Sequence, residues 1–476
     1  MRRKGLLFAL GWVGATGVLA SWPSGASRAV EAPEIQLLTR EVSLGKPEFG
    51  MIVPSLVVSS DSRRVAYAAL RGGKEFVVAD GMEGKEYDGI GTLVFSPDSR
   101  RVAYGAQRGE RQLVVVDGVE GKEYDGIGSL VFSPDSRRVA YVAWRGGRRF
   151  VVVDRAEGKE YEGIATPVFS PDSRRVAYGA QRGGKWLVVV DSVEGKEYDG
   201  IGKGSAVFSP DSRRLAYEAL RGGKQLVEVN GVEGKEYDGI AEGPVFSPDS
   251  KRVAYGAQRG GKQLLVLDGA EGKEYDGIGK GTLVFSPDSK RVAYAGQRGG
   301  KWLVVVDGVE GKEYDEIGKD TLVFSADSRR VAYVAGRGDK RLVVVDDVEG
   351  REYDGIGEGS PVFSADSKRV AYEAKRDGKQ LVVVDGVEGK PYDGIGKGTP
   401  VFSPDSRRVA YEARRGYRWL VVVDSAEGKE YDGFLKASRL VFDSSRQLHA
   451  LAGRGGELFQ VEIEIVTPAA GTVAPP

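Results

Sequence analysis

The chain has 476 residues, and its 69 Lys and Arg residues balance 69 Asp and Glu residues, so the formal net charge is zero. This balance gives no support to binding of nucleic acids or membrane surfaces by the protein as a whole. The sequence has no Cys and one His, His449, which excludes disulfides, thiolate metal sites and metal sites built from several His side chains. We expect no metal or other cofactor and no nucleic-acid partner.

Residues 1–29 have the composition of a secretory signal peptide. A charged start, Arg2 to Lys4, precedes the apolar stretch Leu6–Ala20, which is shorter than the roughly 20 residues that a membrane-spanning helix needs. Small residues ending at Ala20 or Ala29 offer cleavage sites, and an uncleaved N-terminal anchor is the alternative. We expect a periplasmic or secreted protein with no membrane span after the signal is removed.

Internal repetition dominates the rest of the chain. An Asp-Ser pair recurs eleven times at spacings of 37 to 39 residues. The Asp residues of these pairs are Asp61, Asp98, Asp135, Asp172, Asp211, Asp249, Asp288, Asp327, Asp366, Asp405 and, in a degenerate last copy, Asp443. A period near 40 residues is typical of arrays of small β-sheets.

Each copy is predicted to form four short antiparallel strands. In the unit from Thr92 to Gly128, these strands are Leu93–Ser96, Arg101–Gln107, Leu113–Asp117 and Lys122–Ile127. Pro and Asp mark the first turn, and Gly-Gly or a similar pair marks the second in most copies. Ten of the 21 Tyr residues recur in the second strand and ten in the fourth, which indicates packing between units. The fold class is therefore all-β, a β-propeller of eleven four-stranded repeats.

The recurring sequences FSPD, RVAY and LVVVDG resemble the WD-like repeat of the TolB-type propeller family. The resemblance covers ten units well and the eleventh weakly, and it implies a propeller that serves as a protein-binding scaffold in the bacterial envelope. The N-terminal domain of TolB has no counterpart in this sequence.

Eleven units exceed the four to eight blades of most propellers. Two tandem propellers are one arrangement, and one unusually large ring closed by N- and C-terminal strands is the other. Residues 30–54 contain a predicted strand that could complete the last unit and close such a ring. We place the repeats at 55–466 and a disordered C-terminal tail at 467–476.

Catalytic residues are not expected, because residues that recur in ten units cannot all be catalytic. His449 is expected to be structural. Glu218, Glu373 and Glu412 replace small second-strand residues, and Glu228 replaces a third-strand Val. We expect these carboxylates to pair with Arg or Lys of neighbouring blades.

A patterned exception suggests a binding surface. The third strand begins with Trp in the fourth, seventh and tenth units, beside hairpins rich in Arg and Lys, and the same blade face is predicted to collect these hairpins. The candidate partner-binding residues are Trp186, Trp302, Trp419, Tyr417, Arg415, Arg418, Arg182, Lys185, Arg298 and Lys301. Trp and Arg are favoured in protein interfaces, although packing of Trp over the adjacent hairpin is the competing interpretation.

The sequence thus predicts a non-enzymatic, exported scaffold that binds another envelope or extracellular protein. A carbohydrate- or polyanion-binding module is the first alternative. The second is a cryptic hydrolase or lyase, which would need carboxylates from different blades to meet in a channel.

Overall fold

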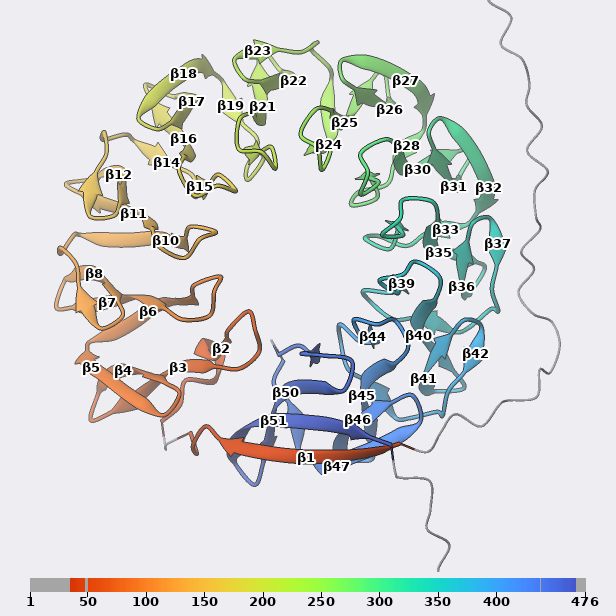
Figure 1. Cartoon of the computed structure of the whole chain (residues 1–476). Coiled ribbons are helices and arrows are strands. Elements are labelled where there is room, and N and C mark those ends of the chain that lie inside the picture. The colour runs from red at the N-terminus through yellow and green to blue at the C-terminus, as the bar shows by residue number, and fades with distance from the viewer. Residues whose placement is uncertain (1–34, 48–49, 437, 468–476) are drawn as a thin grey trace, which may run out of the picture.

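The computed structural model describes residues 35–47, 50–436 and 438–467. In this part of the chain, eleven antiparallel sheets of four or five strands are accompanied by one 3-10 turn, η1 (Val53–Ser55). Figure 1 shows the sheets side by side around an open centre, as the blades of a single ring. The chain is therefore one large propeller and not two tandem ones. The predicted signal peptide and all of the predicted tail except Thr467 lie outside the described residues.

The first strand of each blade lies nearest the centre of the ring (Figure 1). In chain order these strands are β2 (Val57–Val58), β6 (Gly89–Phe95), β10 (Gly126–Phe132), β14 (Gly163–Ile164) with β15 (Val168–Phe169), β19 (Gly200–Ile201) with β20 (Val207–Phe208), β24 (Gly239–Phe246), β28 (Gly277–Ile278) with β29 (Val284–Phe285), β33 (Glu316–Ile317) with β34 (Val323–Phe324), β38 (Gly355–Ile356) with β39 (Val362–Phe363), β43 (Gly394–Ile395) with β44 (Val401–Phe402), and β48 (Gly433–Phe434) with β49 (Val441–Phe442). We number the blades 1 to 11 in this order.

The second and third strands form the buried middle of each blade, because their Val, Ala and Leu side chains face neighbouring blades on both sides. The second strands are β3 (Val65–Arg71), β7 (Val102–Arg108), β11 (Val139–Arg145), β16 (Val176–Arg182), β21 (Leu215–Arg221), β25 (Val253–Arg259), β30 (Val292–Arg298), β35 (Val331–Arg337), β40 (Val370–Arg376), β45 (Val409–Arg415) and β50 (Gln447–Arg454). The third strands are β4 (Lys74–Ala79), β8 (Arg111–Val116), β12 (Arg148–Val153), β17 (Lys185–Val190), β22 (Lys224–Val229), β26 (Lys262–Leu267), β31 (Lys301–Val306), β36 (Lys340–Val345), β41 (Lys379–Val384), β46 (Arg418–Val423) and β51 (Glu457–Val466).

The fourth strands lie at the outer edge and carry the charged side chains that discourage pairing with other sheets. They are β5 (Met82–Tyr87), β9 (Val119–Glu120), β13 (Ala156–Glu157), β18 (Val193–Tyr198), β23 (Val232–Glu233), β27 (Ala270–Tyr275), β32 (Val309–Tyr314), β37 (Val348–Glu349), β42 (Val387–Glu388), β47 (Ala426–Tyr431) and, in blade 11, β1 (Gln36–Ser43).

One predicted strand boundary was wrong. The fourth strand of blade 2 was expected at Lys122–Ile127, but β9 covers only Val119–Glu120 and is followed by an isolated bridge between Gln112 and Tyr124. Ile127 already belongs to β10 of blade 3, where it pairs with Ala143. The chain crosses from the outer edge of one blade to the inner strand of the next at Asp125, and no Gly-Pro signal marks this crossing.

Tyrosine pairs hold adjacent blades together, as the recurrence predicted. Tyr87 of β5 contacts Tyr104 of β7 in the next blade edge to face, with ring centroids 6.2 Å apart. Eight further Tyr residues, in the fourth strand or in the bridge that follows it, contact a second-strand Tyr of the following blade in the same geometry. Such pairs contribute about 0.5–1.5 kcal/mol beyond the burial of their area.

The N-terminal strand closes the ring. β1 pairs antiparallel with β51 along its full length, from Gln36 opposite Val466 to Ser43 opposite Phe459. Blade 11 therefore takes its fourth strand from the other end of the chain (Figure 1). The buried His449 adds a second connection across this seam, since its Nε2 lies 2.7 Å from the carbonyl oxygen of Asp61 in blade 1. The expected structural role of His449 agrees with this position.

The strand order gives the ring two different faces. The turn face carries the turns between first and second strands, such as Ser96–Ser99, and between third and fourth strands, such as Asp117–Gly118. The hairpin face carries the tight turns between second and third strands, such as Gly109–Glu110. Among the described residues, no helix is long and apolar enough to span a membrane.

Candidate functional site

The predicted tryptophans lie on the hairpin face but are partly packed into the ring. Trp186, Trp302 and Trp419 are all half-buried at the start of β17, β31 and β46. The ring of Trp186 covers the backbone of the inner strand, because a Cβ atom placed on Gly163 would lie 3.6 Å from it. Trp302 packs against the core shared by blades 7 and 8. This geometry favours the interpretation that the tryptophans cover the hairpin stems.

The cations that accompany these tryptophans form ion pairs within their blades. Arg182 pairs with Glu194 and Glu197, Lys185 with Asp199, Arg298 with Glu310 and Glu313, Lys301 with Asp315, Arg415 with Glu427, and Arg418 with Asp432. Tyr417 is 95% exposed at one hairpin tip. The three predicted clusters lie in blades 4, 7 and 10 and do not meet. The cations of these three clusters are therefore paired with carboxylates, and their role in partner binding stays a prediction.

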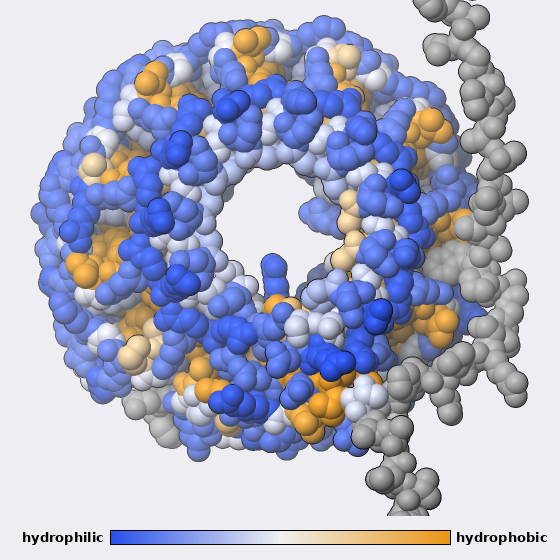
Figure 2. All heavy atoms as spheres, in the orientation of Figure 1, coloured by the Kyte–Doolittle hydropathy of each residue, from blue (hydrophilic) through white to orange (hydrophobic). Residues whose placement is uncertain are grey.

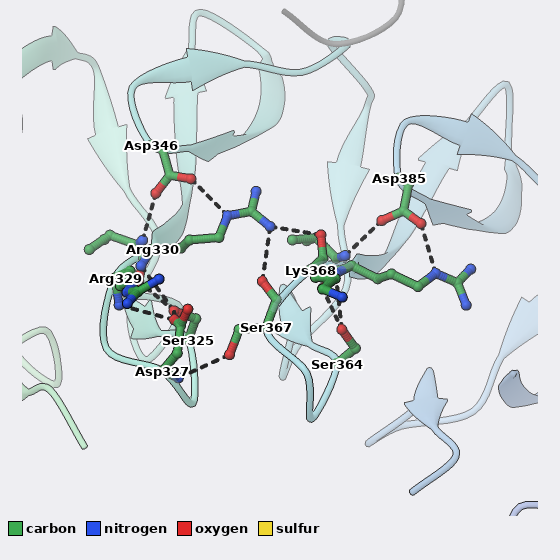
Figure 3. Close-up of polar contacts among 12 residues, drawn as sticks. Ser325, Asp327, Arg329, Arg330, Asp346, Ser364, Ser367, Lys368 and Asp385 are labelled. Atoms are coloured by element: carbon green, nitrogen blue, oxygen red, sulfur yellow. Dashed lines mark hydrogen bonds and ion pairs between the residues drawn. The ribbon is translucent and has the colours of Figure 1, made fainter. Parts of the chain in front are cut away.

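The turn face is built from a repeated hydrogen-bond network (Figure 3). In blade 8, Ser325 Oγ donates to Asp327 over 2.6 Å, and the same carboxylate accepts the backbone N–H of Arg329 over 3.1 Å. The backbone N–H of Asp327 donates over 2.9 Å to Ser367 Oγ in blade 9, which links the two turns. Each turn is thereby fixed both internally and to the next blade.

The second cation of each turn acts as a staple between blades. Arg330 donates from Nε to Asp346 over 2.8 Å in its own blade, and from a guanidinium nitrogen to the carbonyl oxygen of Lys368 over 2.9 Å in blade 9 (Figure 3). Its guanidinium also lies 5.2 Å from the centre of the Phe363 ring, within the range of a cation–π contact. Equivalent contacts recur around the ring, for example from Arg101 to Asp117.

The first cation of most turns has no such role; the exception is Arg63 in blade 1, which pairs with Asp443 of blade 11. In the described part of the chain, six of these side chains are exposed and make no ion pair or hydrogen bond through the guanidinium group: Arg100, Arg137, Arg174, Arg213, Arg329 and Arg407. At the same position, the Lys251 side chain is 82% exposed, whereas the Asp249 carboxylate 3.9 Å away is only 40% exposed. Cations are thus the outermost groups of these turns.

Apolar grooves open between blades on the same face. The groove between blades 2 and 3 has a volume of about 310 Å³ and is lined by Val114, Val116, Val119 and Tyr141. The groove between blades 7 and 8, of about 440 Å³, is lined by the equivalent Val and Tyr residues. Val119 is 54% exposed, and the residues at its position in five other blades are 70% to 72% exposed.

Figure 2 looks onto the turn face, where apolar patches recur around the ring outside an inner circle of strongly hydrophilic side chains. The exposed apolar residues that follow the Asp-Gly turns include Met82, Val119, Val193, Val232, Val309 and Val387. Repeated exposed apolar groups beside unpaired cations are typical of a surface that binds another macromolecule. This combination was not predicted, because the sequence does not distinguish the first Arg of each turn from the second.

The predicted carboxylates do not pair with Arg or Lys of neighbouring blades as expected. Glu228 accepts hydrogen bonds from the hydroxyl groups of Tyr198, over 2.7 Å, and Tyr217. Burial raises the pKa of Glu218, and the nearby charge of Glu242 from blade 6 raises it further. Burial raises the pKa of Glu412 to about 8.

One predicted carboxylate, Glu218, and a second one that was not predicted, Glu242, bear on the hydrolase or lyase alternative. Glu218 and Glu242 come from different blades, and Glu242 belongs to an inner strand. Such a pair is the minimum that acid–base chemistry in the channel would require. Among the described residues, no group of three or more His, Cys, Asp or Glu side chains is arranged to hold a metal ion.

Neither a protein-family model nor a curated protein sequence matches this chain. Among solved structures, the chain resembles TolB from Acinetobacter baumannii at 19% identity, covering 45% of this chain and 64% of that one with a TM-score of 0.24. The propeller domain of the Trilobed protease from Pyrococcus furiosus matches at 15% identity, covering 56% and 98% with a TM-score of 0.29. A eukaryotic initiation factor matches at 13% identity, covering 63% and 87% with a TM-score of 0.39.

These similarities are too low to carry an argument about function. The propeller class rests on the sheets of this chain alone. The narrower resemblance to the TolB-type repeat stays a prediction from the sequence.

Proposed function

We propose that the protein is a non-enzymatic, exported scaffold that binds another protein of the envelope or extracellular space through its turn face. The observation that carries this proposal is the presence, in six described blades, of an unpaired outward Arg on the face that also exposes a row of aliphatic side chains. A partner protein can satisfy both at once, because protein interfaces combine a desolvated apolar centre with charged groups at the rim.

The turn face also has the rigidity that a binding surface needs. The contacts of Arg330 and its equivalents fix most turns to the next blade, so little order has to be gained on binding. The export of the protein is proposed from the composition of residues 1–29 alone.

A capture experiment with the mature protein tests this proposal. Proteins captured from an envelope extract would be quantified by mass spectrometry for the unaltered chain and for two variants. The turn-face variant carries Arg100→Glu, Arg174→Glu and Arg213→Glu, and the hairpin-face variant carries Trp419→Ala and Tyr417→Ser. We expect the turn-face variant to lose its specific partner and the hairpin-face variant to keep it. The reverse result would contradict the proposal and support the tryptophan surface that the sequence suggested.

A hydrolase or lyase is the second candidate, favoured only by the position of the Glu218 carboxylate beside Gly243, the neighbour of Glu242 in the inner strand of blade 6. Hydrolysis of chromogenic glycosides by the mature protein, abolished by Glu218→Gln, would support it. If the protein does not hydrolyse these glycosides, or if hydrolysis persists in Glu218→Gln, the hydrolase or lyase function is ruled out.

A further inference from the structure

The groove between blades 2 and 3 differs from its equivalents in charge. It is lined by Arg137, the unpaired first cation of the blade 3 turn, and by Arg155, which follows the Asp154 turn residue. Neither guanidinium makes an ion pair or hydrogen bond with another described residue. The remaining charges at this groove are neutralised, because Arg101 pairs with Asp117 and Asp154 pairs with Arg138. Two free cations therefore lie beside the Val and Tyr side chains of a groove whose other charged lining residues are paired.

The groove between blades 7 and 8 provides a natural comparison. Its equivalent residues are Arg329 and Asp347, so one free cation is accompanied by a free carboxylate. Arg155 lines its groove together with Tyr141, and Asp347 lines the other groove together with Tyr333.

Arg155 occupies a backbone position that suits Gly. Its φ is 73°, and the equivalent residues in six blades are glycines: Gly81, Gly118, Gly231, Gly269, Gly308 and Gly386. A side chain in this left-handed region costs about 1 kcal/mol or more, since Cβ approaches the following carbonyl oxygen. The fold does not need Arg155, because glycine serves in most blades. Ser192 and Asp347 adopt the same conformation at this position in blades 4 and 8, so Arg155 is distinguished from its equivalents by its charge and not by its backbone.

We propose that the groove between blades 2 and 3 binds an acidic segment of the partner protein, with an aliphatic side chain between Val119 and Tyr141 and an adjacent carboxylate held by Arg137 and Arg155. This inference rests on the proposed function and names the chemistry of the partner. Bidentate contacts of Arg with carboxylates are stronger than neutral hydrogen bonds, and two convergent guanidinium groups make the site selective for anions.

A protein segment fits this groove better than a free acid or a polysaccharide. The groove is open to the surface, and unpaired cations continue on either side of it at Arg100 and Arg174. An extended chain could follow this line, whereas a small acid would use only one groove. The exposed Val119 would stay unburied beneath a sulfated or uronic polysaccharide, which carries no aliphatic side chains.

Methyl NMR of the full mature chain with labelled Val tests the inference. The probe is a blocked hexapeptide of alternating Asp and Val, and the control peptide has Lys in place of Asp. We expect the acidic peptide to shift the Val119 methyl resonances and the lysine peptide to leave them unchanged. Arg155→Gly introduces the residue found in most blades. It should lower the affinity for the acidic peptide about tenfold without lowering the unfolding midpoint of the protein.

Reciprocal substitutions provide the matched control. Arg155→Asp converts this groove to the charge pattern of blades 7 and 8 and should abolish the shift of Val119. Asp347→Arg should create a second site, seen as new shifts of Val309.

Unchanged peptide affinity in Arg155→Gly or Arg155→Asp would overturn the inference, as would equal binding of the lysine peptide. A heparin fragment that shifts Val119 as strongly as the peptide would instead indicate a polyanion site. If these peptide results are negative while the turn-face variant still loses its captured partner, the proposed function stands and only this partner chemistry fails.

Discussion

Arg454 donates two hydrogen bonds of 2.7 Å to the carboxylate of Glu41, although 413 residues separate them in the chain. Glu41 lies opposite Val461 in β51, as Glu427 lies opposite Val422 in blade 10. The N-terminal strand therefore reproduces a feature of the repeat, in which a fourth-strand Glu accepts from a second-strand Arg and from the Tyr of the preceding blade. Tyr431 completes the pattern at the seam with a hydrogen bond of 2.8 Å to Glu41.

Substitution of Glu41 by Ala is expected to destabilise the closure of the ring. Arg454, Lys429 and the Tyr431 hydroxyl would lose their shared acceptor, and loss of hydrogen bonds to a charged group costs about 2 kcal/mol. Urea unfolding measures this loss, and hydrogen exchange of the β1 amides locates it. Glu120→Ala removes the equivalent group from blade 2 and is the control. Equal exchange of β1 in both variants would contradict a role for Glu41 in closure.

The repeat made most of the fold predictable, because the Asp-Ser pairs and the two Tyr series identify each blade without a structure. The charges on the hairpins were harder to interpret. Arg182 donates hydrogen bonds to Glu194 and Glu197, which follow it by 12 and 15 residues. Both carboxylates lie on β18, which pairs with β17 in an irregular register. The same spacings recur in most units, so this signal was present in the sequence.

The candidate site was less predictable for a physical reason. Arg329 and Arg330 are adjacent and chemically identical, and the backbone directs one outward and the other between blades. Only strand register distinguishes them. Arg155 could have been found, since alignment of the copies shows Arg where most units have Gly.

The adjacent arginines of blade 8 allow a sharp test of the staple. Arg330→Ala removes the hydrogen bonds to Asp346 and to the Lys368 carbonyl together with the contact over Phe363, and should cost about 2–3 kcal/mol. Arg329→Ala, which removes an exposed side chain, should change stability by less than about 0.5 kcal/mol. Urea unfolding of the two variants checks the difference. Similar losses from both would show that Arg330 does not join the blades.

Trp302 can be compared with the residue that replaces it in other blades. In blade 6, Gln263 accepts a hydrogen bond of 2.6 Å from the Ile278 amide of the next blade. Trp302 occupies the equivalent position in blade 7, and its indole ring has no atom that can accept such a bond. Trp302→Ala should cost about 2–3 kcal/mol through lost packing. Trp302→Gln should cost about 1 kcal/mol less, because the hydrogen bond to the next blade can form. Thermal unfolding measures the stability of both variants. An equal loss of stability in the two would show that Gln at position 302 does not form the hydrogen bond to the next blade.

Two buried carboxylates predict how stability depends on pH. Burial raises the pKa of Glu412 to about 8 and that of Glu373 to about 7, whereas an unburied Glu titrates near 4.5. Between pH 4.5 and 8 the folded chain therefore holds more protons than the unfolded chain, so stability falls as the pH rises through this window.

Glu412→Gln should remove part of this dependence, by at most about 1.4 kcal/mol for each pH unit between 5 and 8. Urea unfolding midpoints measured from pH 5 to 9 provide the comparison. Glu157→Gln is the control, because a hydrogen bond from Lys122 lowers the pKa of Glu157 to about 2, outside the window. The control should keep the slope of the unaltered chain. A Glu412→Gln slope equal to that of the control would mean that Glu412 is ionised in the folded protein, and that it has a partner or water that stabilises its charge.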